Sequence, residues 1–119
     1  MKRALVVDDS PTMQQMVSLA LSRAGFDVKT APNGKEGLAT AVSPFDLIIT
    51  DINMPEMDGI TMIKGVRALA HHKFTPVLVL TTEAAGDRKD QGRAAGATGW
   101  LTKPFDADKL LAVVRKVVR

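Results

Sequence analysis

Two adjacent aspartates, Asp8 and Asp9, directly follow the apolar run "ALVV" at residues 4–7. At about 4 Å and an effective dielectric constant near 20, two carboxylates repel each other by roughly 4 kcal/mol. A cation or a capping role must offset this repulsion. Helix capping does not require the pair, because Ser10 can cap the next segment and Pro11 suits its first helical position. The pair therefore predicts a cation site.

A third carboxylate, Asp51, ends the apolar run "DLIIT" at residues 46–50 and precedes the turn-rich stretch "INMPEMDG". Three carboxylates without a soft ligand suit a hard divalent ion, and magnesium takes one or two carboxylates while keeping water and a phosphate oxygen. We therefore predict that Asp8, Asp9 and Asp51 bind Mg²⁺. Beside a metal ion, the Asp51 carboxylate could act as a nucleophile toward phosphorus.

Two further polar side chains, Lys103 and Thr81, stand where predicted strands end. The Lys103 ammonium would pair with the carboxylates and then with a phosphoryl oxygen. Thr81 is singled out only by its position, because threonine is an ordinary strand residue. Asp58 and Asp106 precede helical segments and are predicted to be N-caps, and the "NG" at Asn33 predicts a turn before the second helix.

Five short apolar runs predict the strands that position these side chains. They span residues 4–7, 27–30, 46–50, 76–81 and 98–102. The first, third and fourth runs lack polar alternation, which is typical of parallel strands covered on both faces. Helical periodicity fills the segments between the runs. The first helix carries an apolar stripe and ends at Gly25; the stripe consists of Met13, Met16, Val17, Ala20, Leu21 and Ala24.

Alternating strands and helices predict an α/β sheet with right-handed crossovers. The carboxyl ends of its strands share one edge, where ligands bind in open α/β sheets. We therefore expect the candidate side chains to converge at that edge. Asp46, at the start of the third run, would instead lie on the surface at the opposite edge.

The composition bounds the class of protein. A chain of 119 residues that is 45% apolar is expected to form one domain with its own core, spanning residues 1–119. The absence of cysteine excludes disulfides and thiolate metal sites and fits a reducing compartment. The apolar residues near the N-terminus are too few for a signal peptide or a membrane span, so we expect a soluble, cytoplasmic protein with no membrane partner.

The net charge is +3, but the basic residues are scattered, and one Trp, four Phe and no Tyr leave little to stack on bases. We therefore expect an ordinary solvated surface and no nucleic-acid partner. His71 and His72 adjoin Lys73 in a polar stretch. A surface loop is predicted there in preference to a metal site.

Four motifs, "VVDDS", "IITDINMPEMDG", "LVLTTEA" and "TGWLTKPF", occur in order along the chain. Together they resemble, over the whole chain, the receiver domain of two-component response regulators, and most closely the single-domain chemotaxis regulators. The resemblance implies a flavodoxin-like (βα)5 doubly wound α/β fold, whose five-stranded parallel sheet has the strand order 2-1-3-4-5. It also implies Mg²⁺ as the cofactor.

The resemblance implies that Asp51 accepts a phosphoryl group from a histidine kinase and forms an acyl phosphate. Asp9, Asp51 and the backbone carbonyl of Asn53 would ligate Mg²⁺ directly, and Asp8 would act through a water molecule. Lys103 would hold a phosphoryl oxygen. The protein would assist its own phosphorylation and dephosphorylation by positioning and charge neutralisation, so it is not expected to be an enzyme with a separate substrate.

The resemblance also assigns a switch. Thr81 would turn its hydroxyl toward the phosphoryl group, and Trp100 occupies the position of the aromatic switch, with plain packing as its alternative role. Side chains at the positions of Asn53 and Glu83 tune the phosphoryl lifetime in the family. The peptide bond between Lys103 and Pro104 is commonly cis in the family.

Three departures from the family pattern bear on this site. Many relatives carry an arginine near Gln14 and Gln15, and its absence removes positive charge near the acidic edge. Thr82 is bulkier than the alanine often found there, which would restrict access to the phosphoryl group. Trp100 replaces the more usual Tyr or Phe, so the hydrogen bond of a tyrosine hydroxyl is lost.

With no output domain expected after Arg119, the signal would leave through the fourth helix, predicted to span residues 83–96, the fifth strand and the fifth helix. Leu111 and Val118 predict apolar surface beside the fourth helix, with flanking core contacts as the alternative. The downstream partner would be a flagellar motor switch protein in chemotaxis or a histidine phosphotransfer protein in a phosphorelay. A separate phosphatase would be a further partner.

Three other classes of function fit these residues less well. A phosphatase that uses an aspartyl phosphate needs a second acid two residues beyond the nucleophile, where this chain has Asn53. A nucleotide or flavin binder should offer glycine amides or hydroxyls after the first strand, where this chain has two carboxylates. A receiver-like interaction module without phosphorylation would not need the full set of Asp8, Asp9, Asp51, Thr81 and Lys103.

Overall fold

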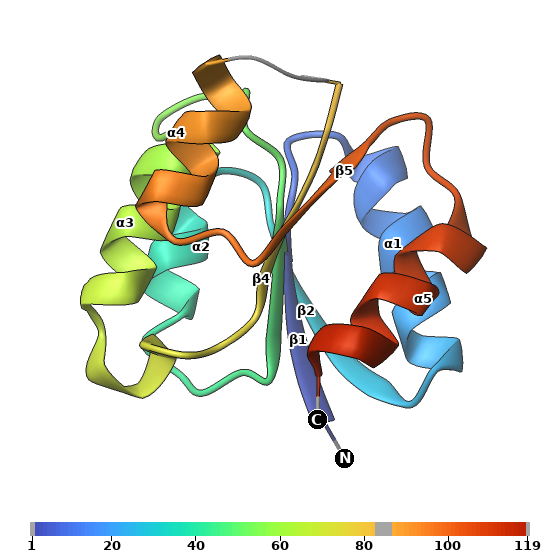
Figure 1. The fold of residues 1–119 in the computed structure, drawn as a ribbon. Helices are drawn as coiled ribbons and strands as arrows, with labels where there is room; N and C mark the ends of the chain where they lie inside the picture. Colours follow the sequence, from blue (N-terminus) through green and yellow to red (C-terminus); the bar gives the residue numbers. More distant parts are fainter. Residues whose placement is uncertain (1, 83–86, 119) are drawn as a thin grey trace.

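The computed structural model describes residues 2–82 and 87–118, which fold into a five-stranded sheet with helices on both faces (Figure 1). The strands are β1 (Lys2–Val7), β2 (Phe26–Ala31), β3 (Leu47–Thr50), β4 (Val77–Thr81) and β5 (Gly99–Thr102). The helices are α1 (Pro11–Arg23), α2 (Gly34–Thr40), α3 (Gly59–Ala68), α4 (Asp87–Ala95), α5 (Ala107–Val117) and the short 3-10 helix η1 (Ala70–His72). Residues 83–86 of the predicted fourth helix lie outside the described residues.

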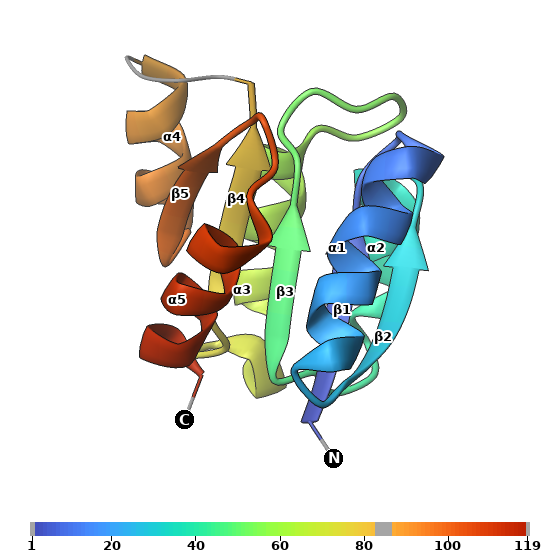
Figure 2. The same ribbon diagram turned by 90° about the vertical axis from the view of Figure 1, so that its right-hand side faces the viewer.

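All five strands run parallel, in the order β2-β1-β3-β4-β5. This confirms the α/β class and the flavodoxin-like strand order. The apolar runs of β1, β3 and β4 are buried, as their lack of polar alternation predicted. Because the strands are parallel, their carboxyl ends share one edge of the sheet, which lies at the top in Figure 2.

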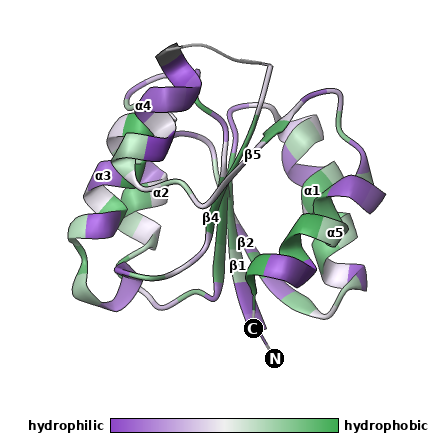
Figure 3. Ribbon diagram, in the orientation of Figure 1, coloured by the Kyte–Doolittle hydropathy of each residue, from purple (hydrophilic) through white to green (hydrophobic). Residues whose placement is uncertain are grey.

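Helices α1 and α5 cover one face of the sheet, and α2, α3 and α4 cover the other (Figure 1). Successive strand residues point to opposite faces, so each central strand contributes to both layers. Ile48 of β3 shares a buried cluster with Ile63 of α3. Its neighbour Ile49 shares the other cluster with Leu21 of α1 and Leu110 of α5. Figure 3 shows the central strands as hydrophobic, while both helical layers carry hydrophilic stretches.

Helix α1 begins and ends as its sequence predicts. The Ser10 hydroxyl accepts a hydrogen bond from the Met13 N–H at 3.3 Å, and Pro11 is the first helical residue. Gly25 follows the helix with φ of +96°, a conformation that favours glycine. The predicted caps Asp58 and Asp106 also accept backbone N–H bonds, and so does Asn33 at the predicted turn before α2.

The buried stripe of α1 is narrower than predicted. Val17, Ala20 and Leu21 are buried, whereas Met16 is 42% exposed and Ala24 is exposed. The sheet covers only one side of this helix, so the residues at the margins of the stripe stay in contact with water.

The prediction of a surface loop is wrong for His72, which is completely buried in η1, although His71 is exposed. The Nε2 atom of His72 lies 3.1 Å from the carbonyl oxygen of Ser43 and must donate to it. Its Nδ1 atom lies 2.8 Å from the Thr75 hydroxyl and accepts from it. A neutral imidazole thus satisfies both neighbours, which a reading of the polar stretch "HHK" could not anticipate.

Arg67, in the last turn of α3, joins three connections near this corner. Its guanidinium donates to the carbonyl oxygens of His72 at 2.8 Å, Thr75 at 2.6 Å and Gly96 at 2.7 Å. These acceptors belong to η1, to the segment that leads into β4, and to the turn after α4. One side chain therefore links the end of α3 to η1, to the segment before β4 and to the turn after α4.

Acidification is expected to destabilise the fold through His72. Burial lowers the pKa of His72 from its ordinary value of 6.5, and the charges of His71 and Arg67 lower it further, against the opposing hydrogen bond to Ser43. The unfolded chain then takes up a proton near pH 6.5, whereas folded His72 does so only at lower pH. The contribution to stability is therefore complete above pH 6.5 and is lost progressively as the pH falls below that value.

Urea unfolding at several pH values measures this loss. The His72→Gln variant is expected to be less stable throughout but to show a flatter pH dependence over the same range, because its amide does not titrate. Equal slopes for the two proteins would contradict the role given to His72.

Candidate functional site

Asp8 and Asp9 lie at the carboxyl end of β1, where the backbone is held from two sides. The Asp8 N–H donates to the Ala31 carbonyl at 3.1 Å, and the Gln14 side chain donates to the Asp8 carbonyl at 2.7 Å. The Asp8 carboxylate accepts from the Ser10 N–H at 2.9 Å and is 4% exposed, whereas Asp9 is exposed. Burial raises the pKa of Asp8, and the Ser10 hydrogen bond offsets only part of that rise.

Asp51 lies at the carboxyl end of the neighbouring strand β3. The Asp51 N–H donates to the Val7 carbonyl at 3.0 Å, which fixes the position of Asp51 relative to the end of β1. Its Oδ1 atom accepts from the Ile52 N–H at 2.6 Å, and its Oδ2 atom accepts from the Lys103 ammonium at 2.8 Å. The residue is 8% exposed, so one carboxylate with a fixed orientation remains just within reach of solvent.

Lys103 follows β5 and reaches back across the end of the sheet. Its Nζ atom lies 2.8 Å from Asp51 Oδ2 and 3.2 Å from Asp8 Oδ2, and these are the two ion pairs of the described residues. Burial alone would lower the pKa of Lys103, but the hydrogen bond and charge of Asp51, with those of Asp8, raise it. The ammonium therefore stays protonated at neutral pH. The Lys103–Pro104 bond is cis, as the resemblance implied.

The three predicted carboxylates come together. One carboxylate oxygen from each of Asp8, Asp9 and Asp51 can be chosen so that all three lie within 4.8 Å of one another. All are hard oxygen donors, two are buried and one is exposed, so an ion there would keep access to water. This donor set fits Mg²⁺, which prefers a few carboxylates together with water and phosphate oxygens. The Lys103 ammonium meanwhile offsets part of their repulsion.

The remaining predicted residues that the structure describes lie on β4, on β5 and in the loop after β3. Thr81 ends β4, is completely buried, and accepts the Lys103 N–H on its backbone carbonyl at 2.8 Å. Asn53 is exposed in the loop after β3. Trp100 is half-buried in β5, close to Gly92 of α4, where an added Cβ would lie 2.6 Å from its ring. Glu83 lies outside the described residues.

The structure also shows residues at the site that sequence reasoning missed. For Gln14, the sequence indicated only the absence of an arginine. In the structure, its side chain donates a hydrogen bond to the Asp8 carbonyl. Gly59 begins α3 and lies directly against the Asp51 carbonyl, so that a Cβ there would clash with it. The only sequence signal for this contact was the "DG" pair after the acidic loop. Arg88 of α4 lines a cleft with Asp9, and its spacing along the chain gave no indication of this.

Replacing Gly59 with alanine is expected to lower the free energy of unfolding by about 2 kcal/mol, because the Cβ must displace the Asp51 backbone. The midpoint of thermal unfolding should fall by roughly 5–10 °C in calorimetry. The control is Gly65→Ala in the same helix, where the added Cβ meets only the tip of the Leu38 side chain, which can rotate. Equal losses in the two variants would mean that the contact with Asp51 has no special cost.

Among the described residues, no helix combines the length and the apolar character needed to cross a membrane.

Comparison with known proteins gives consistent matches over the whole chain. Residues 4–115 match the family described as the response regulator receiver domain. The structure is similar to that of the chemotaxis protein CheY4 of Vibrio cholerae, with 49% identity, a TM-score of 0.94, and coverage of 99% of each chain. It is also similar to the receiver domain of the sensor histidine kinase PA1611 of Pseudomonas aeruginosa PAO1, which was solved with a magnesium ion coordinated in its active site cleft. That match has 25% identity and a TM-score of 0.90, and covers 98% of this chain and 96% of the other.

A curated relative is the DNA-binding dual master transcriptional regulator RpaA of a Synechocystis strain, 41% identical over the full chain. The match covers 50% of that protein. The chain thus spans about half the length of the first curated relatives that it matches.

Proposed function

We propose that this chain, which belongs to the response regulator receiver domain family, accepts a phosphoryl group from a histidine kinase on Asp51. The observation that carries the proposal is the position of the Asp51 carboxylate. It is fixed at a sheet edge, 2.8 Å from the Lys103 ammonium and within the oxygen cluster completed by Asp8 and Asp9. Few structural roles would require three carboxylates and one ammonium to converge from distant parts of the chain.

In the proposed reaction, a carboxylate oxygen of Asp51 attacks the phosphorus of a phosphohistidine. The new P–O bond forms as the P–N bond breaks, and the imidazole leaves with the bond's electron pair and takes up a proton. The Ile52 N–H holds Oδ1 at 2.6 Å and so fixes the plane of the attacking group. Lys103 would then bind an oxygen of the transferred group in place of Asp51 Oδ2. Mg²⁺ held by Asp8, Asp9, Asp51 and the Asn53 carbonyl would neutralise charge on that group.

This reaction is a modification of the protein itself, without turnover of a separate substrate. Its chemistry consists of orienting one carboxylate and placing cations beside it. We therefore class the chain as a phosphoacceptor that assists its own phosphorylation and dephosphorylation, and not as an enzyme.

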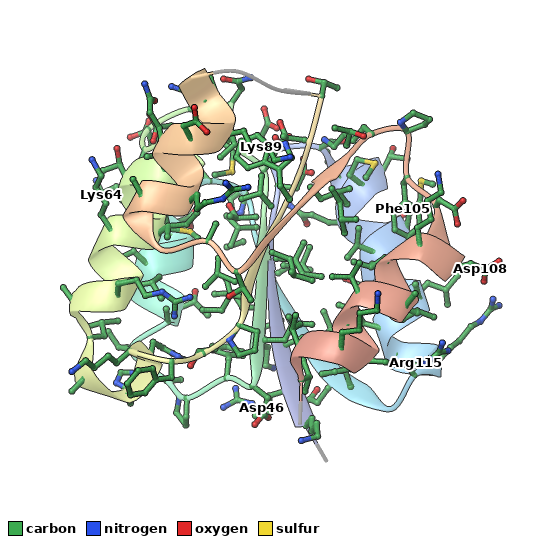
Figure 4. All side chains as sticks on the ribbon, in the orientation of Figure 1. Asp46, Lys64, Lys89, Phe105, Asp108 and Arg115 are labelled. Carbon is green, nitrogen blue, oxygen red and sulfur yellow. The ribbon has the colours of Figure 1, made fainter. Side chains whose placement is uncertain are left out.

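Receiver domains act on downstream proteins, and we propose the surface of α4, β5 and α5 for that contact. A groove of about 480 Å³ on this surface is lined in part by Lys89, Trp100 and Phe105. Figure 4 shows Lys89 and Phe105 on either side of β5. Thr81 ends β4, which pairs with β5, the strand that carries Trp100. A movement of the buried Thr81 hydroxyl toward a phosphoryl group would therefore shift Trp100 and change the shape of this groove.

The apolar surface predicted beside α4 from Leu111 and Val118 is not found there. Both residues are partly buried against the second core cluster, and they line a different groove together with Phe26. Their role is therefore that of flanking core contacts, which was the alternative. The proposed output surface depends instead on the groove lined in part by Lys89, Trp100 and Phe105.

The similarity to CheY4 over 99% of both chains favours chemotaxis, with a flagellar motor switch protein as the target. The alternative is a phosphorelay in which the phosphoryl group passes to a histidine phosphotransfer protein. Pull-downs with the phosphorylated and unphosphorylated chain, using each class of protein as bait, would separate the two.

Intact-mass measurement tests the phosphoacceptor proposal. The chain is incubated with Mg²⁺ and acetyl phosphate, and the mass of one phosphoryl group should be gained. Chelation of Mg²⁺ before the donor is added should prevent the gain, because the metal ion that would neutralise charge on the transferred group is then missing. No gain with Mg²⁺ and fresh donor would contradict the proposal.

A further inference from the structure

A shallow cleft of about 700 Å³ opens beside the phosphoacceptor cluster. It is lined by Asp9, Asn53, Met54, Pro55, Asp58 and Arg88. All but the last come from the loops after β1 and β3, and Arg88 comes from α4. Helix α4 begins at the edge of the sheet where the strands end (Figure 1). Arg88 therefore forms the wall of the cleft on the side of α4.

Among the side chains that the structure describes, both ion pairs belong to Lys103, and Arg88 makes no ion pair with any of the described carboxylates. Its charge nevertheless acts across the cleft. Burial would raise the pKa of Asp58, but the hydrogen bonds from Thr61 lower it, and the positive charge of Arg88 adds to that lowering.

The excess of negative charge around the cleft indicates a function for the positive charge of Arg88. Four carboxylates face this part of the sheet edge, from Asp8, Asp9, Asp51 and Asp58, and Lys103 pairs with only two of them. An incoming phosphodonor is itself an anion and would be repelled on the open side. A cation at the mouth of a cleft attracts such anions and raises their rate of encounter, most strongly at low ionic strength.

We propose that Arg88 is a positioning residue that draws dianionic phosphodonors into the cleft beside Asp51. This inference rests on the proposed phosphoacceptor function and adds a second cation to it. Lys103 contacts the reacting carboxylate of Asp51 directly, whereas Arg88 acts earlier, while the donor approaches. The donor class it favours is a small molecule or side chain carrying a phosphoryl group with two negative charges.

The test is the second-order rate of phosphorylation of Arg88→Gln, Arg88→Lys and wild type, each with Mg²⁺. Acetyl phosphate serves as the dianionic donor and phosphoramidate as the monoanionic one. At low salt, Arg88→Gln should react with acetyl phosphate roughly threefold to tenfold more slowly than wild type. With phosphoramidate, its rate should fall below that of wild type by a smaller factor. Arg88→Lys should keep most of the wild-type rate, and the difference should shrink at high salt as the charges are screened. Lys64→Gln is the matched control, because it makes the same change in net charge on the exposed side of α3.

Titration calorimetry with Mg²⁺ gives a readout that does not depend on phosphorylation. Removal of a nearby cation should leave Mg²⁺ affinity unchanged or slightly increased in Arg88→Gln, whereas a distorted site would bind Mg²⁺ more weakly. Equal rates in wild type and Arg88→Gln, or a loss that is the same for both donors and at all salt concentrations, would overturn the role of Arg88 alone. If wild type itself gains no phosphoryl group from either donor, the proposed function fails and this inference fails with it.

Discussion

Changing Asp51 to asparagine is expected to abolish phosphoryl uptake, with no gain of mass under conditions that fully modify the wild type. The amide has nearly the shape of the carboxylate, and its oxygen can still accept the Ile52 N–H, so the loop after β3 should keep its conformation. What is lost is the anionic oxygen that attacks phosphorus, since an amide is a very poor nucleophile at neutral pH. Intact-mass spectrometry with Mg²⁺ and acetyl phosphate measures the outcome.

The matched control for this prediction is Asp46→Asn. Asp46 lies just before the other end of the same strand, at the bottom in Figure 4, and accepts the Arg3 N–H at 2.8 Å. Its replacement makes the same change in charge and preserves a hydrogen-bond acceptor, so phosphoryl uptake should be normal. A phosphorylated Asp51→Asn protein would mean that another residue is the acceptor.

Replacing Lys103 with methionine is expected to slow phosphorylation by roughly 100-fold or more while strengthening Mg²⁺ binding. The ammonium is the cation that Asp51 and the transferred group would share, and loss of one preorganised group of this kind typically costs two to three orders of magnitude in rate. Because the same ammonium competes with a metal ion for the oxygens of Asp51 and Asp8, its removal should raise Mg²⁺ affinity by roughly threefold to tenfold. Methionine preserves most of the length and packing of the stem.

Rate and affinity must therefore move in opposite directions. Rapid-quench phosphorylation assays give the rate, and calorimetry gives the affinity. Lys64→Met, on the outer side of α3, is the control and should change neither quantity beyond a small factor. A Lys103→Met protein that loses both activity and Mg²⁺ binding would indicate a collapsed site, which the thermal unfolding midpoint would also reveal.

The placement of the site could be predicted because it follows from two simple rules. Apolar runs without polar alternation indicate central parallel strands, and parallel strands end at a common edge. Asp8 and Asp51 each follow such a run, and Lys103 follows the fifth predicted strand, so their meeting required no knowledge of side-chain detail. The order of the strands, by contrast, came from the family resemblance, because periodicity alone does not say which strand lies beside which.

The missed features depend on contacts between different elements and loops, which the local sequence pattern does not specify. His72 is buried because Ser43 and Thr75 provide partners for both ring nitrogens, and nothing in "HHK" specifies them. The need for glycine at position 59 arises from the Asp51 carbonyl against which it packs. Arg88 borders the cleft because of the way α4 lies beside the loop after β3.

The hydrogen bonds from the Arg67 guanidinium to the Gly96 carbonyl determine how α4 can move. Gly96 has φ of +117°, and an added Cβ would run into the Arg67 side chain, so this end of the helix is tethered closely to the rest of the protein. Displacements of α4 must then resemble those of a lever with its pivot at the tethered end, largest near Arg88 and Lys89 and smallest near Ala95. A spectroscopic probe placed on the first turn of α4 would register the greatest amplitude, and one on its last turn would serve as the internal reference.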